Sequence, residues 1–344
     1  MKMGVWFQMK HVSINAPVNS FEAARKAINT ETDEIYCGVR LKGIKHVTFN
    51  GRPSYGSLID FAELTKVTEY AHARNCKVNF VLNLPFMADI LEILAKPHIR
   101  QAVKSEVDSF IVADLGLILL LEQMKVKTPI HIGSFATVRN QEAISFYSQF
   151  NVARVVAPPD TTLKELSSLA NNPYNIEIEA FIHGQGCSNV NGNCYLSHSY
   201  KKQSVEFPDD PLWKLDNDKS FVSIGIRNPC MFTFQMEDWK SDEKMNLNCL
   251  NSFPFCSLCY LPDLLKTNVS VLKIEGRCQP IEYQERVPGE YAALIKLLES
   301  DDIKGYEKYL ENLKRTTPEL HGVCRLKKCF YEREGIDESV STVY

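Results

Sequence analysis

The residues best suited to chemistry lie in one stretch, 177–197, which brings a histidine and two cysteines together. Apolar and polar residues alternate over 176–182, which is the period-two pattern of a strand. His183 ends this pattern, and Cys187 and Cys194 follow in a glycine-rich segment where backbone can approach a ligand closely. The stretch therefore predicts a strand that delivers an imidazole and two thiols to one site.

Cysteine is concentrated in the second half of the chain. Of the 11 cysteines, nine lie after residue 186, and we expect thiolates that bind a metal rather than disulfides. The candidates are Cys187 and Cys194, then Cys230, then Cys256 with Cys259 three residues later. This spacing is wider than the paired Cys-x2-Cys knuckles of zinc ribbons, so it favours an iron–sulfur cluster over zinc. Unrelated buried or surface thiols are the alternative.

Composition limits the cellular setting and the partners. The net charge of −3 in 344 residues gives no footprint of a polyanion-binding surface, so a nucleic-acid partner is not expected. Residues 1–6 lack the apolar run of a signal peptide, and the longest apolar run, 115–121, is too short to span a membrane. We therefore expect a cytoplasmic protein that acts on a small molecule.

Strands and helices alternate along the first 185 residues in units of roughly 25–35 residues, which implies parallel strands with helical crossovers. Seven such units favour an α/β fold of the (β/α)8 TIM-barrel type over an open sheet. The eighth strand is then 269–274, so residues 185–256 form a long cysteine-bearing insertion after strand seven. Residues 290–300 and 303–314 are predicted to be helical and to form a C-terminal tail.

Three charged residues, Lys273, Glu275 and Arg277, lie at the end of the eighth strand, where TIM-barrel enzymes place their sites. Arg277 could hold a carboxylate bidentately, and Lys273 shares a face of the strand with Glu275. A mutual ion pair that closes the barrel is the alternative. Asn83 likewise lies at the end of a predicted strand, the third, where site residues accumulate. His183 could transfer a proton or bind a carboxylate, or equally bond a neighbouring strand.

Two blocks of the sequence resemble the signature of the peptidase U32 family, the collagenase-like proteases. The first runs from Glu179 through His183-Gly-Gln-Gly-Cys187 to Gly192-Asn-Cys194-Tyr-Leu-Ser197, and the second is Lys273-Ile-Glu-Gly-Arg277. The resemblance covers residues 10–285 as one domain and leaves 286–344 as a helical extension.

The resemblance implies a 4Fe–4S cluster and hydroxylation without molecular oxygen, with prephenate as the candidate oxygen donor and a small or aromatic molecule as substrate. It matches the cluster ligands to Cys187, Cys194, Cys230 and Cys256. Short members take part in ubiquinone biosynthesis, whereas longer members act on RNA, and the lack of a long C-terminal extension argues against the RNA branch. Arg227, beside the third cysteine, is a candidate substrate-binding residue.

The sequence also departs from the family pattern. The segment around Cys230 and the long gap after Cys194 differ from the usual motif, and Pro158-Pro-Asp160 replaces a common Ser-Arg-Glu. Three functions therefore stay open: an iron–sulfur hydroxylase, a U32-type metallopeptidase that uses zinc, and a non-catalytic cluster-bearing subunit. The last would need a paralogous U32 partner, and a homodimer is the other expected assembly.

Overall fold

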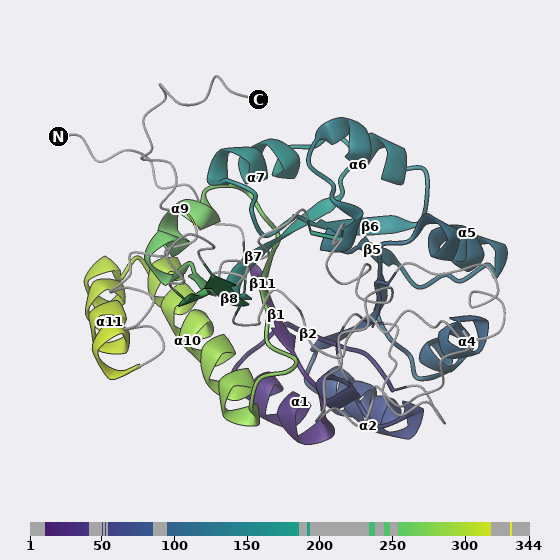
Figure 1. Cartoon of the computed structure of the whole chain (residues 1–344), viewed down its shortest axis with the longest axis horizontal. Helices are drawn as coiled ribbons and strands as arrows, with labels where there is room; N and C mark the ends of the chain where they lie inside the picture. Colours follow the sequence, from purple (N-terminus) through teal and green to yellow (C-terminus); the bar gives the residue numbers. More distant parts are fainter. Residues whose placement is uncertain are drawn as a thin grey trace.

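Eight parallel strands form a closed barrel that is surrounded by helices, as Figure 1 shows. The structure, a computed structural model, describes residues 11–40, 50, 52, 54–84, 95–185, 191–192, 234–237, 244–247, 254–317 and 331. The expected (β/α)8 barrel is therefore confirmed, because β6 pairs with β7 and closes the sheet.

The strand boundaries agree with the sequence pattern to within a few residues. The barrel strands are β1 (Ser13–Pro17), β2 (Glu34–Cys37), β3 (Lys77–Leu82), β4 (Ser109–Val112), β5 (Ile130–Ile132), β6 (Val152–Val156), β7 (Glu177–Gln185) and β11 (Val271–Ile274). Three further strands follow β7 in the sequence, namely β8 (Phe234–Glu237), β9 (Lys244–Leu247) and β10 (Pro254–Cys256). β8 and β9 pair only with each other, in an antiparallel hairpin.

Several helices begin at polar residues whose side chains cap the free N–H groups of the first turn. Ser20, Asp60, Asp114 and Asn140 each accept a hydrogen bond from the N–H three residues later, and Thr162 forms a capping box with the residue at the third helical position. The α-helices are α1 (Phe21–Ile28), α2 (Phe61–His72), α4 (Lys96–Lys104), α5 (Leu115–Gln123), α6 (Gln141–Tyr147), α7 (Leu163–Ala170), α9 (Leu261–Leu265), α10 (Ile281–Glu299) and α11 (Ile303–Thr316). Short 3-10 turns are η1 (Ser54–Gly56), η3 (Ser134–Ala136) and η7 (Leu258–Tyr260).

The helix expected to begin at Glu290 in fact begins at Ile281. Pro288 and Gly289 are helix-breaking by propensity, but both lie inside α10, which packs against α1 and β1. Tertiary packing therefore outweighs the local preference. The division into residues 10–285 and 286–344 stays a prediction, and its boundary falls inside this helix.

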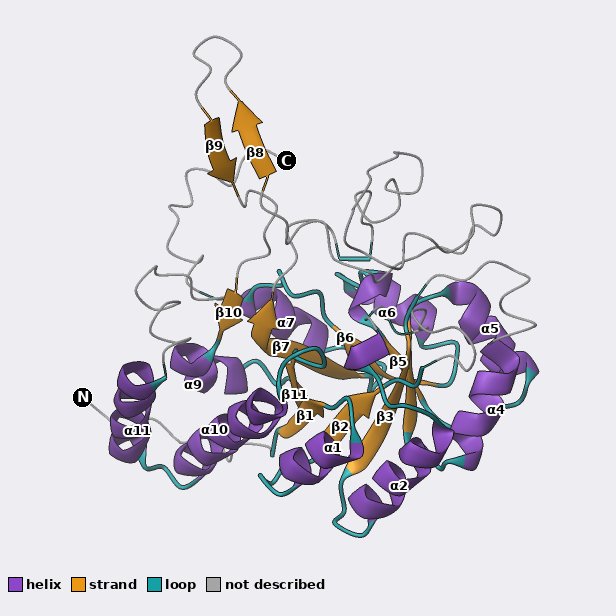
Figure 2. Cartoon of the chain, turned by 60° about the horizontal axis from the view of Figure 1, so that its bottom comes forward, coloured by secondary structure: helices purple, strands orange, loops and turns teal. Residues whose placement is uncertain are grey.

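The chain returns to the barrel after the insertion through β10, which pairs antiparallel with the end of β7. Gln185 is opposite Pro254, and His183 is opposite Cys256. The sequence pattern predicted a loop from Gly184 onward, whereas β7 continues to Gln185 because β10 supplies its hydrogen-bond partners. Figure 2 shows β10 beside β7 at the C-terminal end of the barrel, which we call the mouth.

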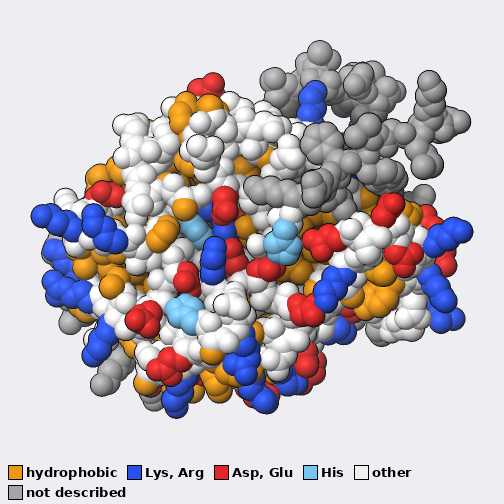
Figure 3. All heavy atoms as spheres, turned by 180° about the vertical axis from the view of Figure 1, so that it is seen from behind, with side chains coloured by type: hydrophobic (Ala, Val, Ile, Leu, Met, Phe, Trp, Pro, Cys, Tyr) orange, Lys and Arg blue, Asp and Glu red, His pale blue; other side chains and the backbone are white. Residues whose placement is uncertain are grey.

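The opposite end of the barrel carries mixed charge. Acidic and basic side chains are interspersed over the face that Figure 3 shows. Over the described part of the chain, no helix is long and apolar enough to span a membrane.

The inside of the barrel is polar at one level, where each of the eight strands contributes one buried polar side chain. These eight residues, here called the polar layer, are Asn15, Glu34, Asn79, Ser109, His131, Arg154, Glu179 and Lys273. They alternate along the strands with apolar residues that face the helices, as the period-two geometry of a strand requires. The core proper therefore lies between strands and helices, and the barrel axis holds charge.

Arg154 of β6 is the centre of the polar layer. Its Nη1 and Nη2 atoms donate to the two carboxylate oxygens of Glu34 across the barrel, at 2.6 and 2.7 Å. The guanidinium also contacts Glu179, at 3.3 Å, and Glu177, at 2.8 Å. Burial alone would raise the pKa of Glu34, but the hydrogen bonds and charge of Arg154 lower it overall.

We predict that Arg154→Met destabilises the protein by about 3–5 kcal/mol, because it leaves two buried carboxylates without their shared cation. Urea unfolding at pH 7 measures the change. Arg25→Met is the matched control, since Arg25 forms only an exposed ion pair with Glu22, and its unfolding midpoint should not change.

The pH dependence gives a second readout. In the native chain Glu34 has a lowered pKa, so its stabilisation is present above the unfolded pKa of about 4.3 and is lost as the pH falls through the folded value. In Arg154→Met the buried carboxylate favours its protonated form, so acidification should stabilise the variant relative to the native chain. Equal stability losses on acidification in both proteins would contradict the assigned role of Arg154.

Candidate active site at the mouth of the barrel

The predicted cysteine ligands are divided between described and undescribed parts of the chain. Cys187, Cys194 and Cys230 lie outside the described residues, as does Arg227. Cys256 is described, buried and located in β10. Among the described residues, no group of three or more histidine, cysteine, aspartate or glutamate side chains is arranged to hold a metal. The full ligand set therefore stays a prediction.

Cys256 lies at a junction of β7, β10 and α10 that is organised by the Tyr291 hydroxyl. That hydroxyl donates to the Ile182 carbonyl at 2.7 Å and accepts from the Ser257 N–H at 3.2 Å. It also forms a hydrogen bond with the Cys256 thiol. Cys256 is thus fixed beside the end of β7, and Cys187 follows Gln185, the last residue of that strand, by two positions.

His183 also contacts this junction. Its Nδ1 atom is 3.3 Å from the Tyr291 hydroxyl, and its ring makes edge contacts with the rings of Tyr283 and Tyr291 on α10. Burial, with a smaller contribution from Arg286, lowers the pKa of His183 to about 4, so the imidazole is neutral at pH 7. The geometry favours the interpretation in which His183 joins neighbouring elements, and its catalytic role stays a prediction.

The segment between Cys187 and Cys194 contacts the loop after β5 through Asn191 and Gly192. Thr137 donates a hydrogen bond to the Asn191 carbonyl at 2.8 Å, and the Asn191 amide donates to the Ser134 hydroxyl at 3.1 Å. A Cβ atom on Gly192 would lie 2.1 Å from the Phe135 carbonyl oxygen. These two residues therefore lie against the mouth on the β5 side of the barrel.

Glu275, just after β11, forms an ion pair with Arg52 at the mouth. Gly184 on β7 packs against Glu275 so closely that a Cβ atom would lie 2.5 Å from the Glu275 Cβ. The φ angle of Gly184 is +133°, which side-chain-bearing residues rarely adopt. The glycine therefore lets β7 approach the end of β11, and this contact helps to fix the Glu275 carboxylate.

Lys273 extends into the polar layer. Its ammonium group donates to Glu179 at 2.6 Å and lies 3.9 Å from the centre of the Tyr36 ring. Burial lowers the pKa of Lys273, although the carboxylate of Glu179 opposes this shift. Lys273 is therefore already paired within the barrel, below the level of the mouth.

Arg277 is 5% exposed and lies over the ends of β1 and β2. Its Nη2 atom donates to the Asn50 carbonyl at 2.8 Å, and its guanidinium carbon is 5.5 Å from the centre of the Tyr36 ring. The Asn19 side-chain amide donates a hydrogen bond to the Arg277 carbonyl at 2.9 Å. The mutual ion pair considered for Lys273, Glu275 and Arg277 does not form, since the first two have other partners and Arg277 pairs with no carboxylate among the described residues.

Asn83 follows β3 and lies at the same end of the barrel, beside Gly133 after β5. Its side-chain oxygen is buried and has no hydrogen-bond partner. The structure therefore brings Asn83, Glu275 and Arg277 to the mouth, as the positions after the strands predicted.

With this geometry established, the family assignment follows from the whole chain. The model of the family described as "Peptidase family U32" matches residues 19–339. The chain belongs to the peptidase U32 family. The resemblance seen in the two sequence blocks is thereby confirmed.

Among U32 relatives, "tRNA hydroxylation protein P" of Helicobacter pylori is 26% identical over 83% of this chain and 65% of its own length. "Uncharacterized protease MJ0090" of Methanocaldococcus jannaschii is 24% identical over 83% of this chain and 66% of its own. This chain thus spans just under two thirds of each. The solved structure of the U32 peptidase Mk0906 covers 81% of this chain and 98% of its own, with 12% identity and a TM-score of 0.44.

Two residues of this mouth, Tyr36 and Arg52, and one of the polar layer, Arg154, were not predicted as site residues from the sequence. Arg154 had a signal, because a single charge within the apolar strand Val152–Val156 must be paired inside the barrel. Tyr36 lies within the strand Glu34–Cys37 with no charge to mark it, and Arg52 lies in a loop without any catalytic pattern.

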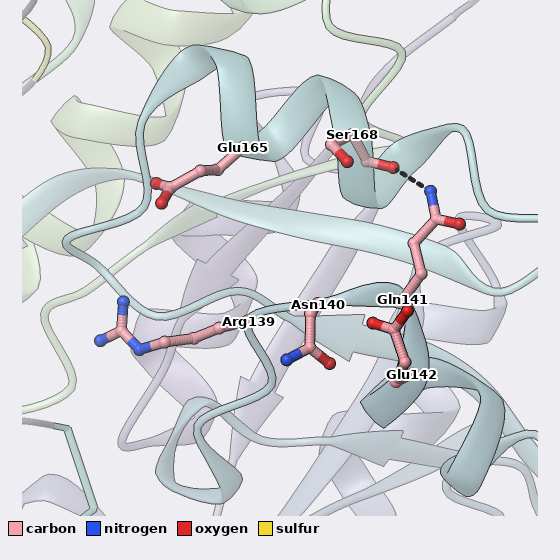
Figure 4. Close-up of a pocket in the computed structure, with 6 residues that line it drawn as sticks. All are labelled: Arg139, Asn140, Gln141, Glu142, Glu165 and Ser168. Atoms are coloured by element: carbon pink, nitrogen blue, oxygen red, sulfur yellow. Dashed lines mark hydrogen bonds between the residues drawn. The ribbon is translucent and has the colours of Figure 1, made fainter.

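A shallow surface pocket of about 300 Å³ lies outside the barrel between α6 and α7. Figure 4 shows Gln141 reaching across it to the Ser168 carbonyl, a hydrogen bond of 2.9 Å. Its only lining cation, Arg139, is paired with Asp160, and two lining carboxylates, Glu142 and Glu165, add negative charge. This pocket therefore offers neither a site for an anion nor a contact with the mouth.

We predict that Gly184→Ala destabilises the U32 chain by about 1–3 kcal/mol, because it combines an unfavourable φ with a clash against Glu275. Chemical unfolding measures the loss. Gly289→Ala is the control. Gly289 lies within helix α10, and a Cβ atom there would be 3.4 Å from Thr30, so this substitution should be neutral or stabilising. Native-like stability of Gly184→Ala would show that β7 does not need this close contact.

Proposed function

We propose that this chain supports hydroxylation of a small or aromatic molecule without molecular oxygen, with a 4Fe–4S cluster held by Cys187, Cys194, Cys230 and Cys256. Prephenate is the candidate oxygen donor. The U32 relative named for tRNA hydroxylation supports a hydroxylation role, and the family's signature cysteines support the cluster.

One structural observation supports the proposal most directly: β10, which contains Cys256, pairs antiparallel with the end of β7, the strand that precedes Cys187 in the sequence. Cys256 is opposite His183, and the segment that begins at Cys187 leaves the same strand two residues after Gln185. Cys256 is buried and held beside the end of β7 by this pairing, which suits a cluster ligand.

When bound, such a cluster supplies electron transfer. The residues of this chain have other tasks in the proposal. Arg277 and Asn83 bind and orient the substrate at the mouth, with Arg227 as a further predicted contact. Glu275, fixed by Arg52 and Gly184, is the carboxylate placed to hold or move a proton. Lys273 is a positioning residue: it binds Glu179 in the polar layer and contacts the Tyr36 ring, which lies beneath the mouth.

A peptidase is the second candidate, because the relative MJ0090 is named a protease. That function would use zinc on the same cysteines. A third candidate is a non-catalytic cluster-bearing subunit that needs a paralogous U32 partner. Co-purification with such a partner, with activity only in the pair, would favour it over both an active homodimer and an active monomer.

RNA is the substrate suggested by the name of the tRNA-hydroxylating relative, whereas composition led us to expect a small molecule. Nucleoside mass spectrometry of total RNA from cells with and without the gene separates the two. Loss of a hydroxylated nucleoside without the gene would make RNA the substrate and would overturn the small-molecule proposal.

We predict that anaerobically purified chain is brown and carries about four irons and four sulfides. Cys256→Ser should lower both markedly, because it removes one thiolate ligand. Cys259→Ser, three residues away and half-buried, is the matched control and should keep the native content. Iron, sulfide and zinc are quantified together.

The same measurement decides between the candidates. Stoichiometric zinc without iron, with peptide cleavage that a chelator abolishes, would favour the peptidase. Loss of iron in Cys259→Ser but not in Cys256→Ser would contradict the ligand assignment. A colourless protein after anaerobic reconstitution would overturn the cluster altogether.

A further inference from the structure

Arg277 has a buried hydrogen-bond donor that no residue in the described part of the chain satisfies. The residue is 5% exposed, and its Nη2 atom donates to the Asn50 carbonyl. Its Nη1 atom is buried and has no hydrogen-bond partner. Buried guanidinium groups are ordinarily paired with carboxylates or fully hydrogen-bonded, because desolvating a charge is costly. The unpaired Nη1 atom therefore marks a place where a hydrogen-bond acceptor is missing among the described residues.

The other cations near this position are already neutralised. Arg52 is paired with Glu275, and Lys273 is paired with Glu179. Among the described residues, no carboxylate forms an ion pair with Arg277, and the like charge of Arg52 lies close enough to disfavour its charged form. Of these three cations at and below the mouth, Arg277 is therefore the one without a carboxylate partner in the described structure.

An apolar surface lies next to this charge. Tyr36, Val81 and Ile111 form a small hydrophobic cluster inside the barrel that is separate from the main core. These residues come from β2, β3 and β4, at positions above the polar layer. The Tyr36 ring faces the Arg277 guanidinium at 5.5 Å and receives the Lys273 ammonium at 3.9 Å. The Arg277 guanidinium and this hydrophobic cluster thus lie next to each other at the mouth.

We propose that Arg277 is the anchor of a carboxylate subsite, with the Tyr36, Val81 and Ile111 cluster beneath the apolar body of the same ligand. The proposal rests on the proposed function, because it names the chemical class of the substrate of that site. A single negative charge matches a guanidinium with one unpaired nitrogen, and a carboxylate oxygen can accept from it. A phosphate dianion would leave excess negative charge in a buried site that offers one free cation among the described residues.

Binding of a simple aromatic carboxylate to the anaerobically purified full chain tests this subsite. Benzoate is the probe, benzamide is its uncharged counterpart, and inorganic phosphate is the competing anion, each titrated by calorimetry. Benzoate should bind at least about tenfold more tightly than either, because only it supplies a planar single charge together with an apolar ring.

Arg277→Met should weaken benzoate binding about tenfold or more, and Arg277→Lys should give an intermediate loss because it keeps the charge without the fork. Arg139→Met is the matched control, since Arg139 is paired with Asp160 on the outer surface, and benzoate should bind it as it binds the native chain. Equal benzoate affinity in Arg277→Met and the native chain would overturn the subsite, as would tighter binding of phosphate than of benzoate.

Stability without ligand separates a binding role from a structural one. If Arg277 serves a ligand, Arg277→Met removes an uncompensated buried charge, and the melting temperature should stay level or rise. A clear fall would mean that the guanidinium mainly holds Asn50, and would overturn the proposal. Iron and sulfide are measured on the same samples. Absence of the cluster with benzoate binding intact would sink the proposed function alone, whereas loss of the subsite with a full cluster would sink only this inference.

Discussion

The buried ion pairs of Arg154 are the interaction on which the barrel depends. This one guanidinium on β6 reaches Glu34 on β2 across the axis and Glu179 on the neighbouring β7. Glu179 in turn accepts from Asn15 on β1 and Lys273 on β11. Hydrogen bonds continue from Glu34 to Asn79, Ser109 and His131, so all eight strands share one network. A polar interior of this kind is costly to bury unless every charge is matched, which ties the strand register to charge pairing.

That constraint also determines what the mouth can present. Lys273 is committed to Glu179, so Glu275 and Arg277, the next residues after β11, are the ones that reach the rim. Glu275 meets Arg52 from a loop, and this leaves Arg277 to carry the local excess of charge. β11 and the residues that follow it thus supply two cations: Lys273 inside the barrel and Arg277 at the mouth. The junction around Tyr291 fixes the neighbouring strand β7 from the outside, so both sides of the mouth have rigid supports.

Sequence pattern was sufficient for the barrel because alternation and capping residues are local signals, as Ser20 and Thr162 illustrate. It failed at α10, where packing against α1 accommodates Pro288 inside a helix, and at the end of β7, where β10 extends the strand. The site was predicted where residues follow strands, as with Asn83 and Arg277. It was not predicted where pairing is long-range: Arg52 meets Glu275 across 223 positions, and no local pattern encodes that contact. Cys187, Cys194 and Cys230 stay predictions from motif alone.

The pairing of β10 with β7 has a consequence for how the chain can change. The insertion leaves the barrel at Gln185 and re-enters at Pro254, and these residues lie opposite each other in the β7–β10 pairing. The two ends of the insertion are therefore held together by the β7–β10 pairing. A longer insertion costs little additional closure entropy, since that cost grows only logarithmically with length. The insertion can therefore change independently of the barrel strands. Its length and sequence can diverge while β1 to β7 and β11 keep their register, because the pairing of Gln185 with Pro254 fixes both ends of the insertion.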